Sequence, residues 1–124
     1  MIVWKLNHMV NSHIAAPWSA PALDRTFHAL ADPTRRSIVG TLSAGDHTIG
    51  TLAAPLPMSL VAVSKHITVL ERAGMLRRTR AGRAQVCTLV GRPLDDASGW
   101  LEHYRLFWVA RVDSLERYLD TEEK

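Results

Sequence analysis

The segment from Ser59 to Gly74, SLVAVSKHITVLERAG, constrains the fold of this chain more than any other. Val63, Ile67 and Leu70 recur at the spacing of one helix face, so we expect a helix with one stripe packed inward. Its other side carries small, apolar or singly charged side chains, whereas a solvated surface helix normally carries many more charges. Such a face suits a surface with polar edges and methyl groups, and the floor of a DNA major groove has both.

A shorter helix is expected just before this segment. Thr48 can cap it by accepting a backbone N–H bond, and Pro55 and Pro57 end it, because proline disfavours helical conformation in the residue before it. Ser59 is placed to cap the longer helix, and Gly74 occupies the usual position of a left-handed C-terminal cap. Short helix, tight turn and longer helix form the helix-turn-helix pattern. The alternative is an ordinary helical hairpin within an all-α domain.

Two short strands around a basic turn are expected next. They span 75–80 and 84–89 and are joined by Ala81-Gly82-Arg83, a short glycine-containing connection typical of β-hairpins. The tip and outer face carry four arginines: Arg77, Arg78, Arg80 and Arg83. Like charges this close repel one another unless a polyanion is nearby. A wing that reaches DNA phosphates or the minor groove explains this placement, and a solvated arginine-rich turn is the alternative.

Positive charge is concentrated in this part of the chain. The whole sequence has 15 Lys+Arg against 12 Asp+Glu, a formal net charge of only +3. Residues 65–92 hold seven basic side chains and one acidic one, whereas residues 93–124 hold eight acidic and four basic. This asymmetry is the electrostatic footprint of a nucleic-acid binder.

The chain of 124 residues is expected to form one domain at 21–124, preceded by an N-terminal arm at 1–20. Its one cysteine, Cys87, excludes an intramolecular disulfide and suits a reducing cytoplasm. No apolar run approaches the ~20 residues needed to span a bilayer, and the N-terminus lacks the apolar core of a secretory signal. We therefore expect a cytoplasmic protein with no membrane partner.

Two further helices are expected ahead of the helix-turn-helix. The first covers 22–30, and Asp32 caps the second, with Pro33 in its first turn. Arg35 and Arg36 in that turn are expected to face solvent or a partner carboxylate rather than DNA.

A long helix is expected at 94–119, where apolar residues recur at alternating steps of three and four. It would be roughly 39 Å long, against a radius of gyration of about 14 Å for a compact chain of this size. The helix should therefore overhang its own domain and expose an aromatic face, which demands a partner. A two-fold homodimer is the commonest solution, and a helix folded wholly onto its own core is the alternative.

ALADPTRRSI at 29–38, VSKHITVLERAG at 63–74 and the Gly82-Arg83 turn, taken together, resemble the ArsR-type winged helix-turn-helix transcriptional regulators. The resemblance covers nearly the whole chain and implies a mainly α fold with a β-hairpin wing at 77–85. It also implies a dimer through the first and last helices, whose recognition helices at 59–73 enter successive major grooves of an imperfect palindrome. The sequence therefore predicts a sequence-specific double-stranded-DNA-binding regulator, a homodimeric repressor.

Site residues follow from these expectations. The wing arginines and Lys65 should contribute phosphate affinity, while the small and methyl-bearing side chains of the recognition helix should discriminate bases. The expected DNA-binding residues are Ser59, Leu60, Val61, Ala62, Ser64, Lys65, Thr68, Arg78, Arg80 and Arg83. The expected dimer interface, with the first helix added by the resemblance, is Leu23, Phe27, Leu94, Leu101, Tyr104, Trp108, Val112 and Leu115.

No metal and no cofactor are expected. Metal-sensing members of the family carry paired cysteines before the recognition helix, or aspartate and histidine pairs on the last helix. Here 49–54 has no such ligand and the last helix has one histidine, His103, whereas zinc needs about four ligands. The alternative is a metal-sensing repressor with a non-standard site across a dimer, drawn from His8, His13, His28, His47 and Cys87. Otherwise regulation should come from a small molecule near the dimer helices or from protein concentration.

Enzymatic activity is not expected. Ser64 and His66 are two residues apart on a helix, so they diverge and cannot form a nucleophile–base pair. The sequence has no glycine-rich phosphate loop and no carboxylate cluster. His66 should be a half-buried member of the recognition helix, and Cys87 a small packed residue. A winged-helix module that binds only protein is the remaining alternative, but its recognition face would be expected to lose its positive charge.

Overall fold

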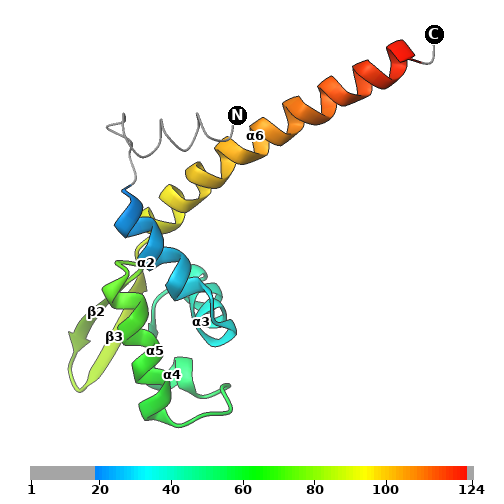
Figure 1. Cartoon of the computed structure of the whole chain (residues 1–124). Helices are drawn as coiled ribbons and strands as arrows, with labels where there is room; N and C mark the ends of the chain where they lie inside the picture. Colours follow the sequence, from blue (N-terminus) through cyan, green and yellow to red (C-terminus); the bar gives the residue numbers. More distant parts are fainter. Residues whose placement is uncertain (1–18, 123–124) are drawn as a thin grey trace.

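The computed structural model describes residues 19–122, which form a small helical body, a three-stranded sheet and one projecting helix (Figure 1). The elements in chain order are α2 (Ala20–Leu30), α3 (Pro33–Ser43), β1 (His47–Thr48), α4 (Ile49–Ala53), α5 (Leu60–Arg72), β2 (Leu76–Ala81), β3 (Ala84–Leu89) and α6 (Arg92–Glu122). The N-terminal arm expected at 1–20 lies outside the described residues except for Ser19 and Ala20, where α2 is capped and begins.

The helix boundaries follow the capping residues identified in the sequence. Backbone N–H groups donate to Asp32 Oδ2 at 3.0 Å, to Thr48 Oγ1 at 3.1 Å and to Ser59 Oγ at 3.1 Å, at the starts of α3, α4 and α5. Gly74 has φ of +75° directly after α5, the left-handed conformation that glycine adopts without strain. The predicted helix-turn-helix from α4 to α5 is confirmed.

The hairpin is confirmed with a shift at its first strand. β2 includes Ala81, so only Gly82 and Arg83 form the turn, and Gly82 has φ of +63°. The sequence did not reveal β1, which pairs antiparallel with β3 and completes a sheet of order β1-β3-β2. A strand of two residues is too short to show the alternation on which strand prediction depends.

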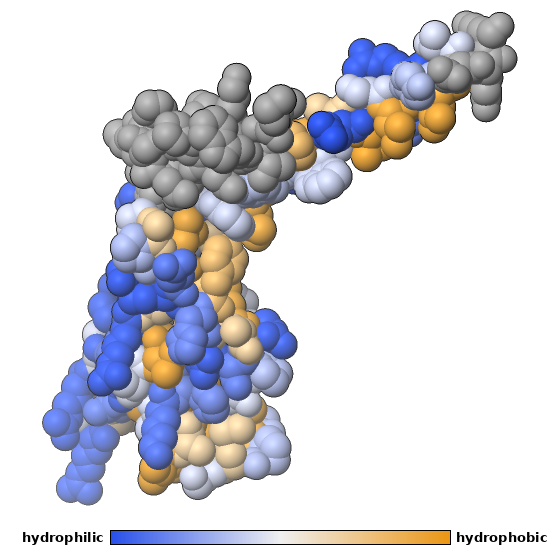
Figure 2. All heavy atoms as spheres, viewed as in Figure 1, coloured by the Kyte–Doolittle hydropathy of each residue, from blue (hydrophilic) through white to orange (hydrophobic). Residues whose placement is uncertain are grey.

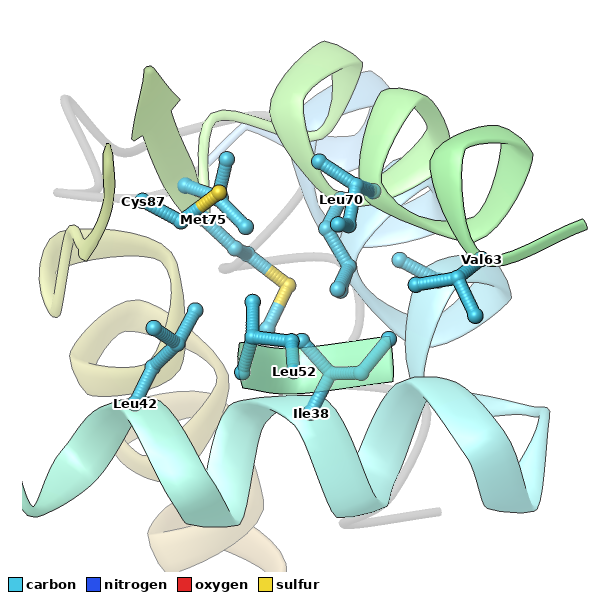
Figure 3. Close-up of a cluster of buried hydrophobic side chains, with 10 residues drawn as sticks. Ile38, Leu42, Leu52, Val63, Leu70, Met75 and Cys87 are labelled. Carbon is cyan, nitrogen blue, oxygen red and sulfur yellow. The ribbon is translucent and has the colours of Figure 1, made fainter. Parts of the chain in front are cut away.

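The core lies between α3, α4, α5 and the sheet (Figure 3). Val63, Ile67 and Leu70 of α5 are fully buried there, which confirms the predicted inward stripe. Cys87 of β3 is also fully buried and packs as a small apolar residue, and burial raises the pKa of its thiol. These contacts hold α5 against the body and leave its opposite face outward.

Helix α6 begins on α2 and then leaves the body as a rod (Figure 1). Trp100 bridges the two helices, with its ring centroid 5.5 Å from Phe27 and 4.8 Å from Tyr104. From Leu101 onward, α6 exposes a series of large apolar side chains, so it does not fold back onto its own core. They are Leu101, Leu106, Trp108, Val109, Val112, Leu115, Tyr118 and Leu119.

Residues expected at the dimer interface fall into three groups, of which Phe27, Leu94 and Tyr104 are half-buried. Leu101, Trp108, Val112 and Leu115 are exposed by 50 to 60%. Leu23 is only 7% exposed, so it is a core residue of its own protomer with little surface left for a partner. The resemblance placed Leu23 at an interface, but it lies on the side of α2 that faces inward.

None of the described helices, α6 included, is long and apolar enough to cross a membrane.

Candidate nucleic-acid interface

The outward face of α5 is apolar at its start and basic farther along. Leu60 and Val61, the first two residues after the Ser59 cap, are 56% and 66% exposed. Ala62 and Ser64 are half-buried, and Lys65 is exposed one turn after Val61. This face therefore offers methyl groups, one hydroxyl and one ammonium group to whatever approaches it.

Thr68, the last residue assigned to this face, is occupied within the protein. Its hydroxyl donates to the Ser64 carbonyl at 3.0 Å and accepts a hydrogen bond of 2.7 Å from Arg78 Nη2. Arg78 also donates to Gln85 Oε1 at 3.4 Å, and its Nε lies 3.3 Å from Glu71 Oε1, without hydrogen-bond geometry to any described residue. Arg78 thus ties the wing to the recognition helix instead of extending into solvent.

Strand alternation explains why Arg78 differs from the other wing arginines. Leu76 points into the core, and residues two apart on a strand share a face, so Arg78 points toward α5 as well. Arg77 lies on the opposite face. Arg80 and Arg83 lie at the tip, and neither makes a hydrogen bond or ion pair to α5. The signal was present in the sequence as the spacing from Leu76.

Arg77, Arg80 and Arg83 are exposed and make no hydrogen bond or ion pair within residues 19–122. Figure 2 shows hydrophilic side chains extending from the hairpin, while hydrophobic ones reach the surface near α4 and the start of α5. The hairpin tip and the start of α5 lie at the end of the molecule remote from the free end of α6 (Figure 1). The exposed apolar side chains at the start of α5 and the free arginines of the wing therefore lie at the same end of the molecule.

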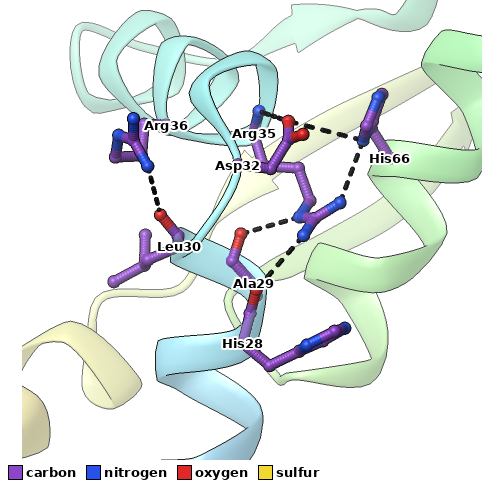
Figure 4. Close-up of polar contacts among 7 residues, drawn as sticks. All are labelled: His28, Ala29, Leu30, Asp32, Arg35, Arg36 and His66. Atoms are coloured by element: carbon purple, nitrogen blue, oxygen red, sulfur yellow. Dashed lines mark hydrogen bonds and ion pairs between the residues drawn. The ribbon is translucent and has the colours of Figure 1, made fainter.

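A second polar cluster fixes α5 against α2 and α3 (Figure 4). Arg35 donates to the carbonyls of Ala29 at 2.7 Å and His28 at 3.1 Å, and Arg36 donates to that of Leu30 at 2.8 Å. Both arginines therefore cap the C-terminus of α2, where helix carbonyls have no intrahelical partner. The expected solvated face is confirmed for Arg36, which is exposed while it makes this bond. It is wrong for Arg35, which is half-buried, because the turn at Ala31-Asp32 brings the α2 carbonyls within its reach.

Arg35 also reaches the recognition helix. Its Nη1 lies 3.1 Å from His66 Nδ1, and because a guanidinium only donates, Nδ1 accepts and the imidazole carries its proton on Nε2. His66 Nδ1 also lies 3.7 Å from Asp32 Oδ2. The pKa of the Asp32 carboxyl is held below its usual range, chiefly by the hydrogen bond that the Arg35 backbone N–H donates to it. His66 is half-buried, as expected, and the cluster links α5 to both preceding helices.

Within the part of the chain that the structure describes, no three His, Cys, Asp or Glu side chains converge on a point that could hold a metal ion. His28, His47 and Cys87 lie on α2, β1 and β3 and do not form such a group. His8 and His13 lie outside the described residues. The expectation that the protein binds no metal stays a prediction.

A mainly helical body, a capped helix-turn-helix and a basic β-hairpin together define a winged helix-turn-helix domain of DNA-binding proteins. Comparison with known proteins agrees. A family model described as a helix-turn-helix domain matches residues 30–79. The HTH-type transcriptional regulator Rv2034 of Mycobacterium tuberculosis is 36% identical over 99 residues, covering 80% of this chain and 90% of that protein.

The transcriptional repressor SdpR of Bacillus subtilis is 30% identical over 82 residues, covering 66% of this chain and 91% of that protein. A crystal structure of an ArsR family transcriptional regulator superimposes with a TM-score of 0.67 at 39% identity, over 71% of this chain and 91% of that one. This chain belongs to the ArsR family of winged helix-turn-helix transcriptional regulators. It is a DNA-binding regulator, as its sequence predicted, and the family is not one of enzymes.

Proposed function

We propose that this protein is a homodimeric repressor that binds an imperfect DNA palindrome, with one α5 helix in the major groove of each half-site. The observation that carries the proposal is the outward face of α5, where Leu60, Val61 and Lys65 lie exposed beside the free arginines of the wing. The similarity to a repressor, SdpR, supports repression rather than activation. Repression then follows from occupying the promoter.

The roles of the interface residues divide by chemistry. Lys65, Arg80 and Arg83 are long, exposed cations suited to phosphates, which position the protein without specifying sequence. Leu60, Val61, Ala62 and Ser64 lie where the first turns of a recognition helix meet base edges. Ser59 caps α5, so its hydroxyl is already used. Thr68 and Arg78 are bonded to each other and position the wing.

The second copy is proposed to cover the exposed stripe of α6. Leu101, Trp108, Val112 and Leu115 recur on one side of the helix, and with Tyr104 between the first two the steps are three and four, the spacing of a helix-pair seam. Phe27 meets the Trp100 ring edge-on and Tyr104 meets it at a tilt; these two residues and the half-buried Leu94 would border this seam. Because α6 projects away from α5 and the wing, two copies joined there leave both DNA-binding faces open (Figure 1).

Sequence-specific binding is tested with a duplex selected by the pure protein from random-sequence DNA. At physiological salt we expect this duplex to bind about a thousandfold or more tightly than a scrambled duplex of equal composition. Both affinities should fall steeply with salt, because basic side chains that neutralise phosphates release bound counterions, and this release favours binding less as the salt concentration rises. Fluorescence anisotropy at two salt concentrations measures both effects. Equal affinity for the two duplexes would contradict the proposal.

The two kinds of wing arginine can be separated by matched substitutions. Arg78→Met removes the bonds to Thr68 and Glu71 and should lower the free energy of unfolding by about 1–2 kcal/mol, while the salt dependence of DNA binding stays unchanged. Arg80→Met should leave unfolding unchanged and reduce the slope of log affinity against log salt by about 1.8, which is about 0.9 for each of the two protomers. Urea titration and anisotropy give the two readouts. The opposite pattern would make Arg78 the phosphate contact.

A further inference from the structure

We propose that this protein recognises its operator mainly through thymine methyl groups, contacted by Leu60 and Val61 at the start of α5. The inference rests on the proposed function and adds the base chemistry that the recognition helix selects. Its starting observation is that, among residues 19–122, the two large apolar side chains exposed outside α6 are neighbours at this one point. None of the described residues covers them.

Their place on the helix favours contact with bases. In helix-turn-helix proteins the N-terminal residues of the recognition helix contact base edges in the major groove. Leu60 and Val61 are the first two residues of α5, and they are 56% and 66% exposed. The thymine C5-methyl is the one apolar group that a base pair presents in that groove. Exposed methyl-bearing side chains at this position therefore match thymine in particular.

The polar side chains of α5 offer little competing chemistry. Strong direct readout uses arginine or lysine on guanine and asparagine or glutamine on adenine. The Thr68 hydroxyl is bonded to Ser64 and Arg78, and Glu71 faces Arg78. His66 accepts from Arg35 through Nδ1, and its ring is directed to the α2–α3 junction. Among the first two turns this leaves the Ser64 hydroxyl and the Lys65 ammonium to form hydrogen bonds with bases, beside the Nε2–H of the His66 ring that Arg35 holds.

The surroundings of the patch identify DNA as its occupant. Lys65 lies one turn away on the same helix. The wing, whose Arg80 and Arg83 are exposed at the hairpin tip, ends at the same end of the molecule as the start of α5 (Figure 1). An apolar patch bordered by free cations suits a polyanion whose groove floor carries methyl groups. Val61 is also β-branched and has one preferred rotamer in a helix, so ordering it against a methyl group costs little entropy.

The test removes only the methyl groups. Each thymine of the selected duplex is replaced in turn by deoxyuridine, which keeps every hydrogen-bonding group and loses the C5-methyl. We expect a three- to fivefold loss of affinity, approximately, at two or more positions per half-site. In Val61→Ala and Leu60→Ala variants the same replacements should have little further effect, because the partner side chain is already absent. Lys65→Gln is the control, since it should weaken binding to thymine and uracil duplexes equally.

The outcomes separate this inference from the proposed function. If no duplex is bound in preference to a scrambled one, the proposed function fails. Thymine recognition by Leu60 and Val61 is refuted, while the proposed function stands, in either of two cases. In the first, binding is sequence-specific but deoxyuridine replacement has no effect at any position. In the second, the Val61→Ala variant still loses as much affinity on deoxyuridine replacement (the uracil penalty) as the parent protein does. Thermal melting of each variant should match that of the parent protein, because both substituted side chains are exposed.

Discussion

Replacing Leu101 and Leu115 together by aspartate should convert the protein into a folded monomer that no longer holds its operator. Both side chains are more than half exposed in the protomer, so the change places no charge in the protomer core. In the proposed dimer the same positions lie in the seam, where an unpaired carboxylate costs several kcal/mol. Since each half-site is then bound independently, operator affinity should fall by about 10² to 10⁴-fold.

Sedimentation velocity measures the mass of this variant, and anisotropy with the selected duplex measures its affinity. The matched control is Ala110→Asp with Thr121→Asp, which adds the same charge to α6 on the side away from the apolar stripe. This control should remain dimeric and bind normally. A Leu101→Asp/Leu115→Asp protein that stays dimeric with unchanged affinity would show that the dimer forms elsewhere.

Features set by neighbouring residues could be predicted from the sequence. The caps at Asp32, Thr48 and Ser59 and the left-handed Gly74 depend on contacts within three or four residues, and all are confirmed. The buried stripe of α5 is equally local, because helical spacing alone places its members on one face. The projection of α6 could also be predicted, because the expected helix is much longer than the radius of a compact chain of this size.

Contacts between distant segments could not be predicted in the same way. Arg35 reaches His66, 31 residues away, and the tie between Arg78 and Thr68 depends on how the hairpin docks on α5. Charge alone assigned Arg78 to phosphates, although its spacing from Leu76 placed it on the inward face of the strand. Both arginines act within the fold. Because Arg78 was among the expected DNA contacts, the interface has one free cation fewer than expected.

Stability and specificity are separated on the two faces of α5. The inner face packs against α3, α4 and the sheet with no exposed surface, so its side chains contribute to folding. The outer face is tied at two points, by Arg35 to the preceding helices and by Arg78 to the wing. Its exposed residues are thus held in a fixed orientation without taking part in the core. Substitutions on the two faces should therefore alter different measurements.

Ile67→Ala tests this separation and should have the largest effect on stability of any single change considered. The side chain is fully buried, so its truncation leaves a cavity and should lower the free energy of unfolding by about 2–5 kcal/mol. That is a large part of the 5–15 kcal/mol typical of a domain. Urea denaturation measures the change, at fixed protein concentration because a dimer gains stability by mass action.

Val61→Ala is the matched control on the outer face of the same helix. It removes apolar atoms too, but from a side chain that is 66% exposed, so unfolding should change by less than about 0.5 kcal/mol. Conversely, Ile67→Ala protein that remains folded should keep its preference for the selected duplex and its uracil penalty, whereas Val61→Ala should lose the penalty. If Ile67→Ala changed base preference while stability stayed constant, the division of α5 into a structural and a recognition face would be wrong.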